Sequence, residues 1–289
     1  MRPFIISTDT TSDLPAEFAA EHQISIHPLH YLIDDKEYGM ELGELTPPEF
    51  YQTMRDGKMP TTNATNLGYD IKLMEEAVEK GNDILHLSFS SQMSTSYNNA
   101  RLAAEDVMAR HPECKIIVMD SKNATCGLGV LIRLLVKMKE SGCTLEEAAR
   151  WVEDTLPHTV CNFTLPALFH MWRGGRLKKS SAILGTALKI QPVLHINDDG
   201  ALEPQKKVRG RAAAVRGLHA GLSELCAAGK KPELVCITHG DCPEEAEALA
   251  ETIRNTYGID EVYISYLSPT LGAHSGPGTL TLGYIGEKK

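Results

Sequence analysis

The sequence predicts an α/β protein built from two domains, the first of which holds a parallel sheet covered by helices. From about residue 69 to residue 156, short apolar runs alternate with longer amphipathic runs through short connections, a pattern typical of parallel sheets. The length of 289 residues suits two domains. We expect an N-terminal domain over residues 1–157, a break at Pro157, and a smaller mixed-sheet domain over residues 158–289.

The first elements are expected around a polar turn. An apolar run at residues 4–7 predicts a strand, and the polar residues 8–13 predict a turn after it. A helix is then expected from Leu14, because Asp13 is a plausible N-cap and Pro15 falls in the first turn, where its missing N–H costs nothing.

A hairpin and a second helix are expected next. Residues 24–33, with Tyr38 after an acidic turn, predict a strand and hairpin. The run Thr46-Pro47-Pro48-Glu49 is a helix start of the capping-box type. Residues 59–67 are rich in Thr and Asn and show no periodicity, so we expect a loop there.

The alternating region supplies the rest of the first domain. Strands are expected at residues 84–89 and 115–119. Helices are expected at residues 69–80 (ended by Gly81), at 95–110, after Gly127-Leu128-Gly129, and at 144–156, the last opened by a Thr-x-x-Glu cap.

The second domain begins with a predicted strand at residues 159–163. A hairpin is expected at residues 190–196 and 201–207, because Asn197-Asp198-Asp199-Gly200 between them is a strong turn signal. Helices are expected at 211–228 and 243–257, strands at 234–238 and 261–266, and a glycine-rich loop with a last strand at the end.

Composition excludes several classes of protein. The formal net charge of −9 and the pI near 5.7 argue against a nucleic-acid binder, which needs a basic face. Seven cysteines without a CxxC pair favour reduced thiols as small apolar fillers and no metal site. No run approaches the length of a membrane span, and the start lacks a signal peptide. We therefore expect a cytoplasmic protein without stable membrane insertion.

Common catalytic motifs are missing from the sequence. It contains no phosphate-binding P-loop and no HExxH motif. The run Gly272-Ala273-His274-Ser275-Gly276 misses the G-x-S-x-G nucleophile motif by one residue, and Gly127-Leu128-Gly129 lacks the third glycine of a dinucleotide fingerprint.

Three hydroxyl-rich loops remain as candidate functional segments. They are residues 60–63, residues 90–96 and residues 273–279. The second follows a buried-type strand and opens a helix, which places it at the carboxyl edge of the sheet, where α/β proteins collect ligands. Hydroxyls together with the free N–H groups of a helix start bind anions well.

Each loop also has a plain structural interpretation. Ser94 is more often a helix cap than a ligand at such a position. Thr61 and Thr62 follow a proline in a turn, where Thr is common. His274 is more often a hydrogen-bonded structural histidine, and Gly276 and Gly278 are compatible with positive φ alone.

Taken together, the loops resemble one family. The runs that carry the resemblance are FIISTDTTSDLP, MPTTNATN, SFSSQMSTSYNNA, MDSKNATCGLG, FHMWRGGRL and LGAHSGPGTLTLGY. In this order, and over nearly the whole chain, they resemble the DegV family of fatty-acid-binding proteins. The resemblance implies two α/β domains with one acyl chain in a tunnel between or within them. It also implies a partner, a fatty acid kinase that phosphorylates the bound carboxyl group for phospholipid synthesis, and no cofactor.

The resemblance assigns residues to the carboxylate site. Thr62 and Ser94 match the carboxylate-binding hydroxyls, with a further set nearby: Thr61, Ser91, His274 and Ser275. The sequence departs from the family pattern at Asn63-Ala64, at Gln92 and Thr95, and at His170-Met171-Trp172. These departures leave the hydroxyls intact and bear on the preference for tail length and unsaturation.

Two basic clusters are candidates for docking of the kinase. The first comprises Arg173, Arg176, Lys178 and Lys179, and the second comprises Lys206, Lys207, Arg209 and Arg211. Solvated charge around turns is the plain alternative. We favour docking for Arg209, whose position resembles a family arginine implicated in partner contact, with Arg173 and Arg176 as further candidates.

Two other functions stay open at the level of sequence. One is a small hydrolase or phosphotransferase that uses Ser91 or Ser94 with His274, although no acidic residue that would orient His274 can be identified. The other is a binder of a different amphiphile, such as a retinoid or a sterol. The leading hypothesis is a lipid carrier that is not itself an enzyme.

Overall fold

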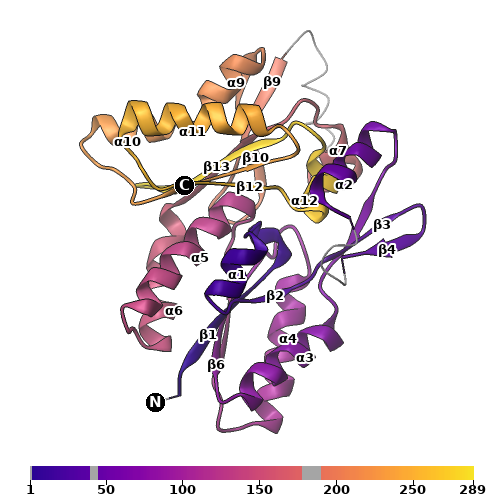
Figure 1. Cartoon of the computed structure of the whole chain (residues 1–289), viewed down its shortest axis with the longest axis vertical. Helices are drawn as coiled ribbons and strands as arrows, with labels where there is room; N and C mark the ends of the chain where they lie inside the picture. The colour runs from indigo at the N-terminus through magenta and orange to yellow at the C-terminus, as the bar shows by residue number, and fades with distance from the viewer. Residues whose placement is uncertain (1, 40–44, 178–189) are drawn as a thin grey trace.

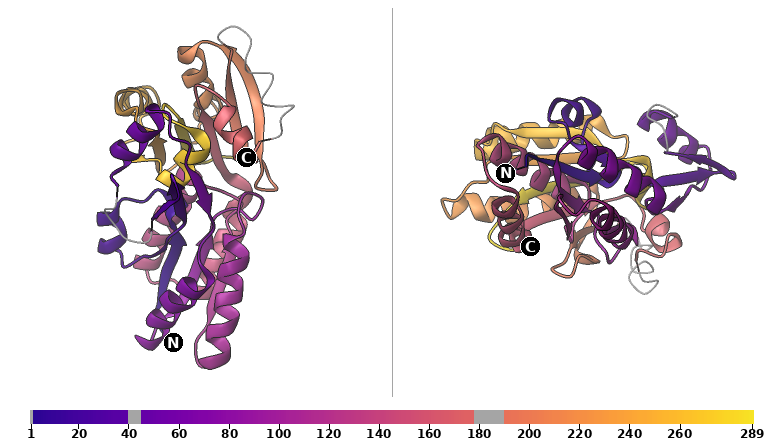
Figure 2. Two further views of the ribbon diagram at one scale, coloured as in Figure 1. Left: turned by 90° about the vertical axis from the view of Figure 1, so that its right-hand side faces the viewer. Right: turned by 90° about the horizontal axis from the view of Figure 1, so that it is seen from below.

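Two sheets follow one another along the long axis of the molecule (Figures 1 and 2). The computed structural model describes residues 2–39, 45–177 and 190–289. In Figure 1 the sheet of the first half of the chain lies below and the sheet of the second half lies above. The predicted α/β architecture, with a parallel first sheet and a mixed second sheet, is confirmed.

The lower sheet has four parallel strands in the order β2-β1-β6-β7. They are β1 (Phe4–Asp9), β2 (Ser25–His27), β6 (Asp83–Ser88) and β7 (Ile116–Asp120). One face packs on α1 (Ala16–Glu21), α5 (Thr125–Glu140) and α6 (Leu145–Thr155). The other face packs on α3 (Leu67–Glu79) and α4 (Ser96–Arg110). The strand order reverses between β1 and β6, which creates the kind of crevice where ligands bind beyond the strand ends.

The upper sheet is mixed, with six strands in the order β10-β9-β8-β13-β11-β12. The strands are β8 (Thr159–Thr164), β9 (Ile190–Ile196), β10 (Leu202–Arg209), β11 (Val235–His239), β12 (Val262–Tyr266) and β13 (Leu280–Ile285). Helices α9 (Arg211–Leu218), α10 (Ala220–Ala227) and α11 (Pro243–Tyr257) cover one face. Although the second domain was expected to be smaller, its sheet has more strands than the first.

Helix α5 lies between the two sheets and packs on both. Its sequence is apolar nearly all round, as expected of a buried helix. The side chain of Arg133 is also buried, and its guanidinium stacks between the rings of Phe18 and Tyr263. The helix was expected to start after Gly129 but starts at Thr125. Gly127 therefore lies inside the helix, where a Cβ would clash with Cys161.

A small third sheet lies beside the upper half (Figure 1). It pairs β4 (Lys36–Tyr38), β3 (His30–Ile33) and β5 (Thr61–Asn63), all antiparallel. The expected loop at residues 59–67 thus contains a short strand, because β3 offers it a partner. Helix α2 (Pro47–Arg55), which opens with the predicted Thr46–Glu49 capping box, packs on α12 (Pro269–Ser275).

Several sequence predictions need correction. Asp13 does not cap α1, whose N-cap is Pro15; its carboxylate instead accepts a hydrogen bond from the Ser268 N–H at 2.8 Å. The helix expected over 211–228 is divided at His219. The segment expected to be a glycine-rich loop is helical up to Ser275, as α12, and only residues 276–279 form the loop that leads into β13. The remaining short helices are η1 (Thr10–Ser12), η2 (Leu156–His158) and α7 (Phe169–Arg173).

The expected break at Pro157 falls within η2, between the two sheets, and stays a prediction. The first sheet takes all its strands from before residue 121, and the upper sheet takes all its strands from after residue 158. Within the described residues, no helix is both long and apolar enough to span a bilayer.

Candidate functional site

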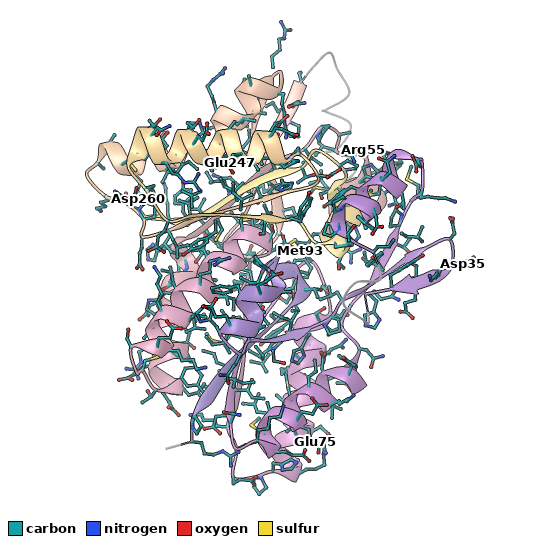
Figure 3. The ribbon with its side chains drawn as sticks, in the orientation of Figure 1. Asp35, Arg55, Glu75, Met93, Glu247 and Asp260 are labelled. Carbon is teal, nitrogen blue, oxygen red and sulfur yellow. The ribbon has the colours of Figure 1, made fainter. Side chains whose placement is uncertain are left out.

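An apolar cavity lies between the two halves, beyond the end of β6. About 700 Å³ free of protein atoms lies in the cavity and in the adjoining space that is open to solvent. Figure 3 shows Met93, one of its wall residues, near the centre of the molecule. The apolar wall is formed by residues of both halves, among them Leu29, Phe89, Met93, Ala124, Cys161, Phe163, Met171, Ile196, Leu202, Leu267 and Leu271.

Threonine side chains in the wall do not make its interior polar. The hydroxyls of Thr125 and Thr281, which both line the cavity, hydrogen-bond to the hydroxyl of Thr238 at 2.5 and 2.7 Å. The hydroxyl oxygen of Thr281 also accepts the N–H of Thr238. Because these groups satisfy one another, the wall is compatible with an apolar tail.

The polar mouth contains Thr62 and His274, which come from opposite halves of the chain. The His274 Nε2 atom lies 2.6 Å from the Thr62 hydroxyl oxygen, and both residues line the cavity. Burial, and then the charges of Arg176 and Arg173, lower the pKa of His274 to about 3. The imidazole is therefore neutral at physiological pH.

The surroundings of His274 assign its tautomer. Its Nδ1 atom is buried without a partner among the described residues. It also lies so close to Gly174 that a Cβ there would overlap it. An unpaired buried N–H is rarer than an unpaired buried acceptor, so the proton resides on Nε2 and is donated to Thr62. The Thr62 hydroxyl accepts that bond and directs its own proton elsewhere.

Ser94 is the second hydroxyl of the mouth. Its oxygen accepts the N–H of Ser96 at 3.2 Å and lies 2.9 Å from the Ser96 hydroxyl. Ser94 therefore bonds to the first residue of α4, although the N-cap of that helix is Thr95 and not Ser94. Ser94 lines the cavity as well. Like Thr62 and His274, it is half-buried, at the border between the cavity and solvent.

Two arginines brace the mouth. Arg176 lines the cavity and donates to the carbonyl oxygens of Met93 and Gly174 at 3.2 and 2.7 Å. Arg173 donates to those of Pro60 and Ala273 at 2.7 and 3.3 Å, joining the segment before Thr62 to the helix of His274. Neither guanidinium forms an ion pair with a carboxylate of the described residues, so both give the mouth a positive potential.

One family model matches nearly the whole chain. The DegV family model, described as "Uncharacterised protein, DegV family", matches residues 3–287. The chain belongs to the DegV family. A DegV domain-containing protein of Clostridium perfringens is 35% identical over 290 residues, which cover 100% of this chain and 99% of the relative.

Solved structures of other proteins share the fold. A stearic acid-binding protein of Eubacterium ventriosum is 25% identical, covers 98% of both chains and superposes with a TM-score of 0.90. The fatty acid kinase B3 protein of Streptococcus pneumoniae, solved with linoleic acid, has a TM-score of 0.85. It covers 98% of this chain and 99% of its own at 22% identity, and that likeness concerns the fold alone.

In this DegV-family chain, not every residue predicted for the carboxylate site reaches the cavity. Thr62, Ser94, His274 and Ser275 line it, and the Ser275 hydroxyl donates to the Leu271 carbonyl oxygen. Ser91 is exposed, and its hydroxyl donates to Asp120 at 2.6 Å. Thr61 points to solvent from the same strand as Thr62, because neighbouring residues of a strand face opposite sides.

The basic clusters predicted for docking divide into three groups. Arg173 and Arg176 are bonded to the mouth, and Arg211 pairs with Glu245 at 2.6 Å. Lys178 and Lys179 lie outside the described residues. Three residues are exposed on the edge strand β10 and form no ion pair with another described residue: Lys206, Lys207 and Arg209.

Sequence reasoning missed three contributors to the site in this DegV-family member. Arg176 was assigned to docking but lines the cavity, and Gly174 provides the space for His274. Ser96 was recognised only as part of a hydroxyl-rich loop. The run Arg173-Gly174-Gly175-Arg176 could have pointed to Gly174 and Arg176, because paired glycines often mark a place where another group approaches the backbone closely.

Proposed function

We propose that this protein binds one long-chain fatty acid, buries its acyl chain in the cavity and holds its carboxylate at the mouth. The observation that carries the proposal is the apolar cavity whose mouth is lined by two hydroxyls, Thr62 and Ser94. The stearic acid-binding relative of the same fold supports this choice of ligand.

The energetics suit such a ligand. At ~0.8 kcal/mol per buried CH₂, a long acyl chain gains roughly 10 kcal/mol on leaving water. A stranded carboxylate would lose several kcal/mol of that gain. Hydroxyl donors contribute ~1.5–3 kcal/mol each to a charged acceptor. Arg176 adds a positive charge to the lining of the cavity.

We further propose that the protein presents the carboxylate to a fatty acid kinase and does not itself catalyse phosphorylation. The half-buried positions of Thr62 and Ser94 keep the head group within reach of a partner. The exposed cations of β10, with Arg209 foremost, supply a face that an acidic partner surface would recognise. The plain alternative for the two lysines is protection of the sheet edge against aggregation.

The hydrolase alternative needs Ser94 and His274 to act on each other. Instead, Ser94 bonds with Ser96, and His274 bonds with Thr62. A histidine with a pKa of about 3 is also a weak general base at neutral pH. These contacts favour the carrier over the enzyme.

Native mass spectrometry of the freshly purified protein tests the ligand. We expect a mass excess that disappears on denaturation and matches a fatty acid. Thr62→Val and Ser94→Ala should lower fatty acid retention, while Thr61→Val and Ser91→Ala, one to three residues away and outside the cavity, should not. Equal retention in all four variants would contradict the proposed site.

Phosphorylation assays with the kinase test the second step. Arg209→Glu should slow acyl-phosphate formation and leave fatty acid binding intact. Arg150→Glu, an exposed reversal on α6, is the matched control. Equal rates for both variants would remove Arg209 from the docking face, and turnover by the protein without kinase would revive the enzyme hypothesis.

A further inference from the structure

A chain of hydrogen bonds leads from the mouth of the cavity into the interior of the lower half. It begins at Ser94, whose oxygen lies 2.9 Å from the Ser96 hydroxyl. The Ser96 oxygen accepts the N–H of Thr65 at 3.2 Å. The Thr65 hydroxyl donates to Asp70 Oδ2 at 2.7 Å, and Asp70 Oδ1 lies 2.7 Å from His27 Nδ1. Four of these five side chains are almost fully buried, and only Ser94 reaches the cavity.

The partners of Ser96 set the direction of its hydroxyl. A serine hydroxyl has one proton and two lone pairs. One lone pair accepts the Thr65 N–H, and among the described residues the proton has one hydrogen-bond acceptor, the oxygen of Ser94. If Ser94 donated instead, the buried Ser96 proton would have no partner among the described residues. Ser96 is therefore the donor.

Counting the hydrogen bonds of the Ser94 hydroxyl in the same way gives the direction of its proton. Its oxygen accepts two bonds, one from the Ser96 hydroxyl and one from the Ser96 N–H. Both lone pairs are then occupied, so the only unused part of the group is its proton, and the free side of the residue is the cavity. Ser94 thus acts as a donor toward the ligand. His274 imposes the same direction on Thr62.

The outer links hold Thr65 in place. Its hydroxyl is bonded to Asp70, and its carbonyl oxygen accepts the Asn99 Nδ2–H at 2.6 Å. Both bonds restrain Thr65, whose backbone N–H donates to the Ser96 hydroxyl oxygen. His27 restrains Asp70 in turn, and its ring lies edge-on to His86 at 4.7 Å between centroids. A buried carboxylate in two hydrogen bonds of this kind is a rigid anchor.

We propose that Ser96, Thr65, Asp70 and His27 are positioning residues that fix the Ser94 hydroxyl as a hydrogen-bond donor to the ligand carboxylate. The inference rests on the proposed function and adds the groups that prepare the head-group site. With both hydroxyls set as donors before binding, the mouth matches an acceptor-only carboxylate and matches a neutral head group less well.

Two variants and one control test the proposal. Ser96→Ala removes the hydroxyl that donates to Ser94, and Thr65→Val removes the bond to Asp70 while keeping the backbone N–H. Ser88→Ala, a buried serine on β6 outside the network, is the control for loss of a buried hydroxyl. The ligands are palmitate labelled with ¹³C at the carboxyl carbon and 1-hexadecanol, which has the same tail and a neutral head group.

We expect Ser96→Ala to weaken palmitate binding about 5-fold, the loss of one modest hydrogen bond, and to change hexadecanol binding less than about 2-fold. The ¹³C signal of bound palmitate should move toward its position in water. Thr65→Val should move both readouts in the same direction by less, and Ser88→Ala should leave both unchanged.

The possible results distinguish failure of the proposed fatty acid binding from failure of the positioning role alone. If the wild-type protein binds neither ligand, the proposed function fails and the positioning role fails with it. If the wild type binds palmitate, but both variants keep the wild-type preference for palmitate over hexadecanol and the wild-type ¹³C signal, only the positioning role is overturned. An equal loss for both ligands in both variants would likewise overturn it, because it would indicate general damage. Should Ser96→Ala not fold, Thr65→Val decides alone.

Discussion

The imidazole of His274 and the hydroxyl of Thr62 meet at 2.6 Å although 212 residues separate them. Thr62 is held by the small sheet of the first half, and His274 by α12 of the second. The mouth of the cavity is therefore complete only when the two halves are packed together.

This relationship depends on the absence of a side chain at Gly174. We predict that Gly174→Ala weakens fatty acid binding roughly 10-fold, because the new methyl group would push the His274 ring away from Thr62. A displaced ring leaves Thr62 without the bond that directs its proton, a loss of ~1–1.5 kcal/mol. Fatty acid titration monitored by tryptophan fluorescence or calorimetry measures the change.

Gly175→Ala is the matched control for that variant. Gly175 has open space around its Cα but a φ of +73°, so alanine there strains the backbone and touches nothing. It should lower thermal stability slightly and leave fatty acid affinity unchanged. Equal affinities for the two variants would show that the position of His274 does not control binding.

Removal of the charge of Arg176 should weaken binding and change the titration of His274. We predict that Arg176→Gln lowers fatty acid affinity about 10-fold at low salt and less at high salt, since salt screens an exposed charge. Because Arg176 contributes to the lowered pKa of His274, that pKa should rise in the variant. Proton NMR of the imidazole follows the titration; an unchanged pKa would contradict the electrostatic role.

Asp13 should make the protein less stable as the pH rises toward neutrality. Burial, offset by Thr125 and Ser268, raises the pKa of Asp13 to about 7 from 3.8. The folded state therefore holds this proton more tightly than the unfolded chain. Its stabilising effect is complete below about pH 4 and is lost as the pH rises through 7, on the order of 4 kcal/mol in total.

Urea unfolding between pH 4 and pH 8 tests this dependence. The Asp13→Asn variant should lose less free energy of unfolding over that range than the wild type does. Asp154→Asn, on the exposed surface of α6, should follow the wild type. A difference between wild type and Asp13→Asn that stays constant with pH would exclude the shifted pKa.

Filling the cavity should have opposite effects on the empty protein and on binding. Ala124 is buried in the wall at the start of α5. We predict that Ala124→Leu raises the thermal stability of the ligand-free protein and lowers affinity for the longest fatty acids most, because the added carbons occupy space for the tail. Ala100→Leu, in the packed core between α3 and α4, should destabilise by ~1–3 kcal/mol instead. Unchanged chain-length preference in Ala124→Leu would place the tail elsewhere.

The sequence predicted the regular elements well because their signals are local. Capping boxes at Thr46 and Thr144 mark helix starts that the structure reproduces, and the alternation of apolar runs predicts the parallel sheet. Asp13 was misassigned because its partner, Ser268, is 255 residues away. The strand at Thr61–Asn63 was missed because it depends on pairing with β3 and has no apolar alternation of its own.

The candidate site was predictable to the level of loops but not of side chains. The hydroxyl-rich runs pointed to Thr62, Ser94 and His274, and these three share one cavity. The sequence could not show which of Ser91 and Ser94 faces the cavity. Ser91 does not, because its hydroxyl bonds to Asp120, a contact that the sequence does not reveal. Nor could the sequence assign a role to Ser96. That proposed role depends on the direction in which the Ser96 hydroxyl donates its proton, and this follows from its partners in the fold.

The cavity wall takes its side chains from both halves, so under the proposed function the cargo is also part of the core. Emptying it removes packing from both sheets at once and shifts the folding equilibrium of the whole molecule. Cellular proteases that sample the transiently opened state would then degrade the empty carrier faster than the loaded one. The amount of carrier in the cell would follow the supply of lipid without any dedicated regulator.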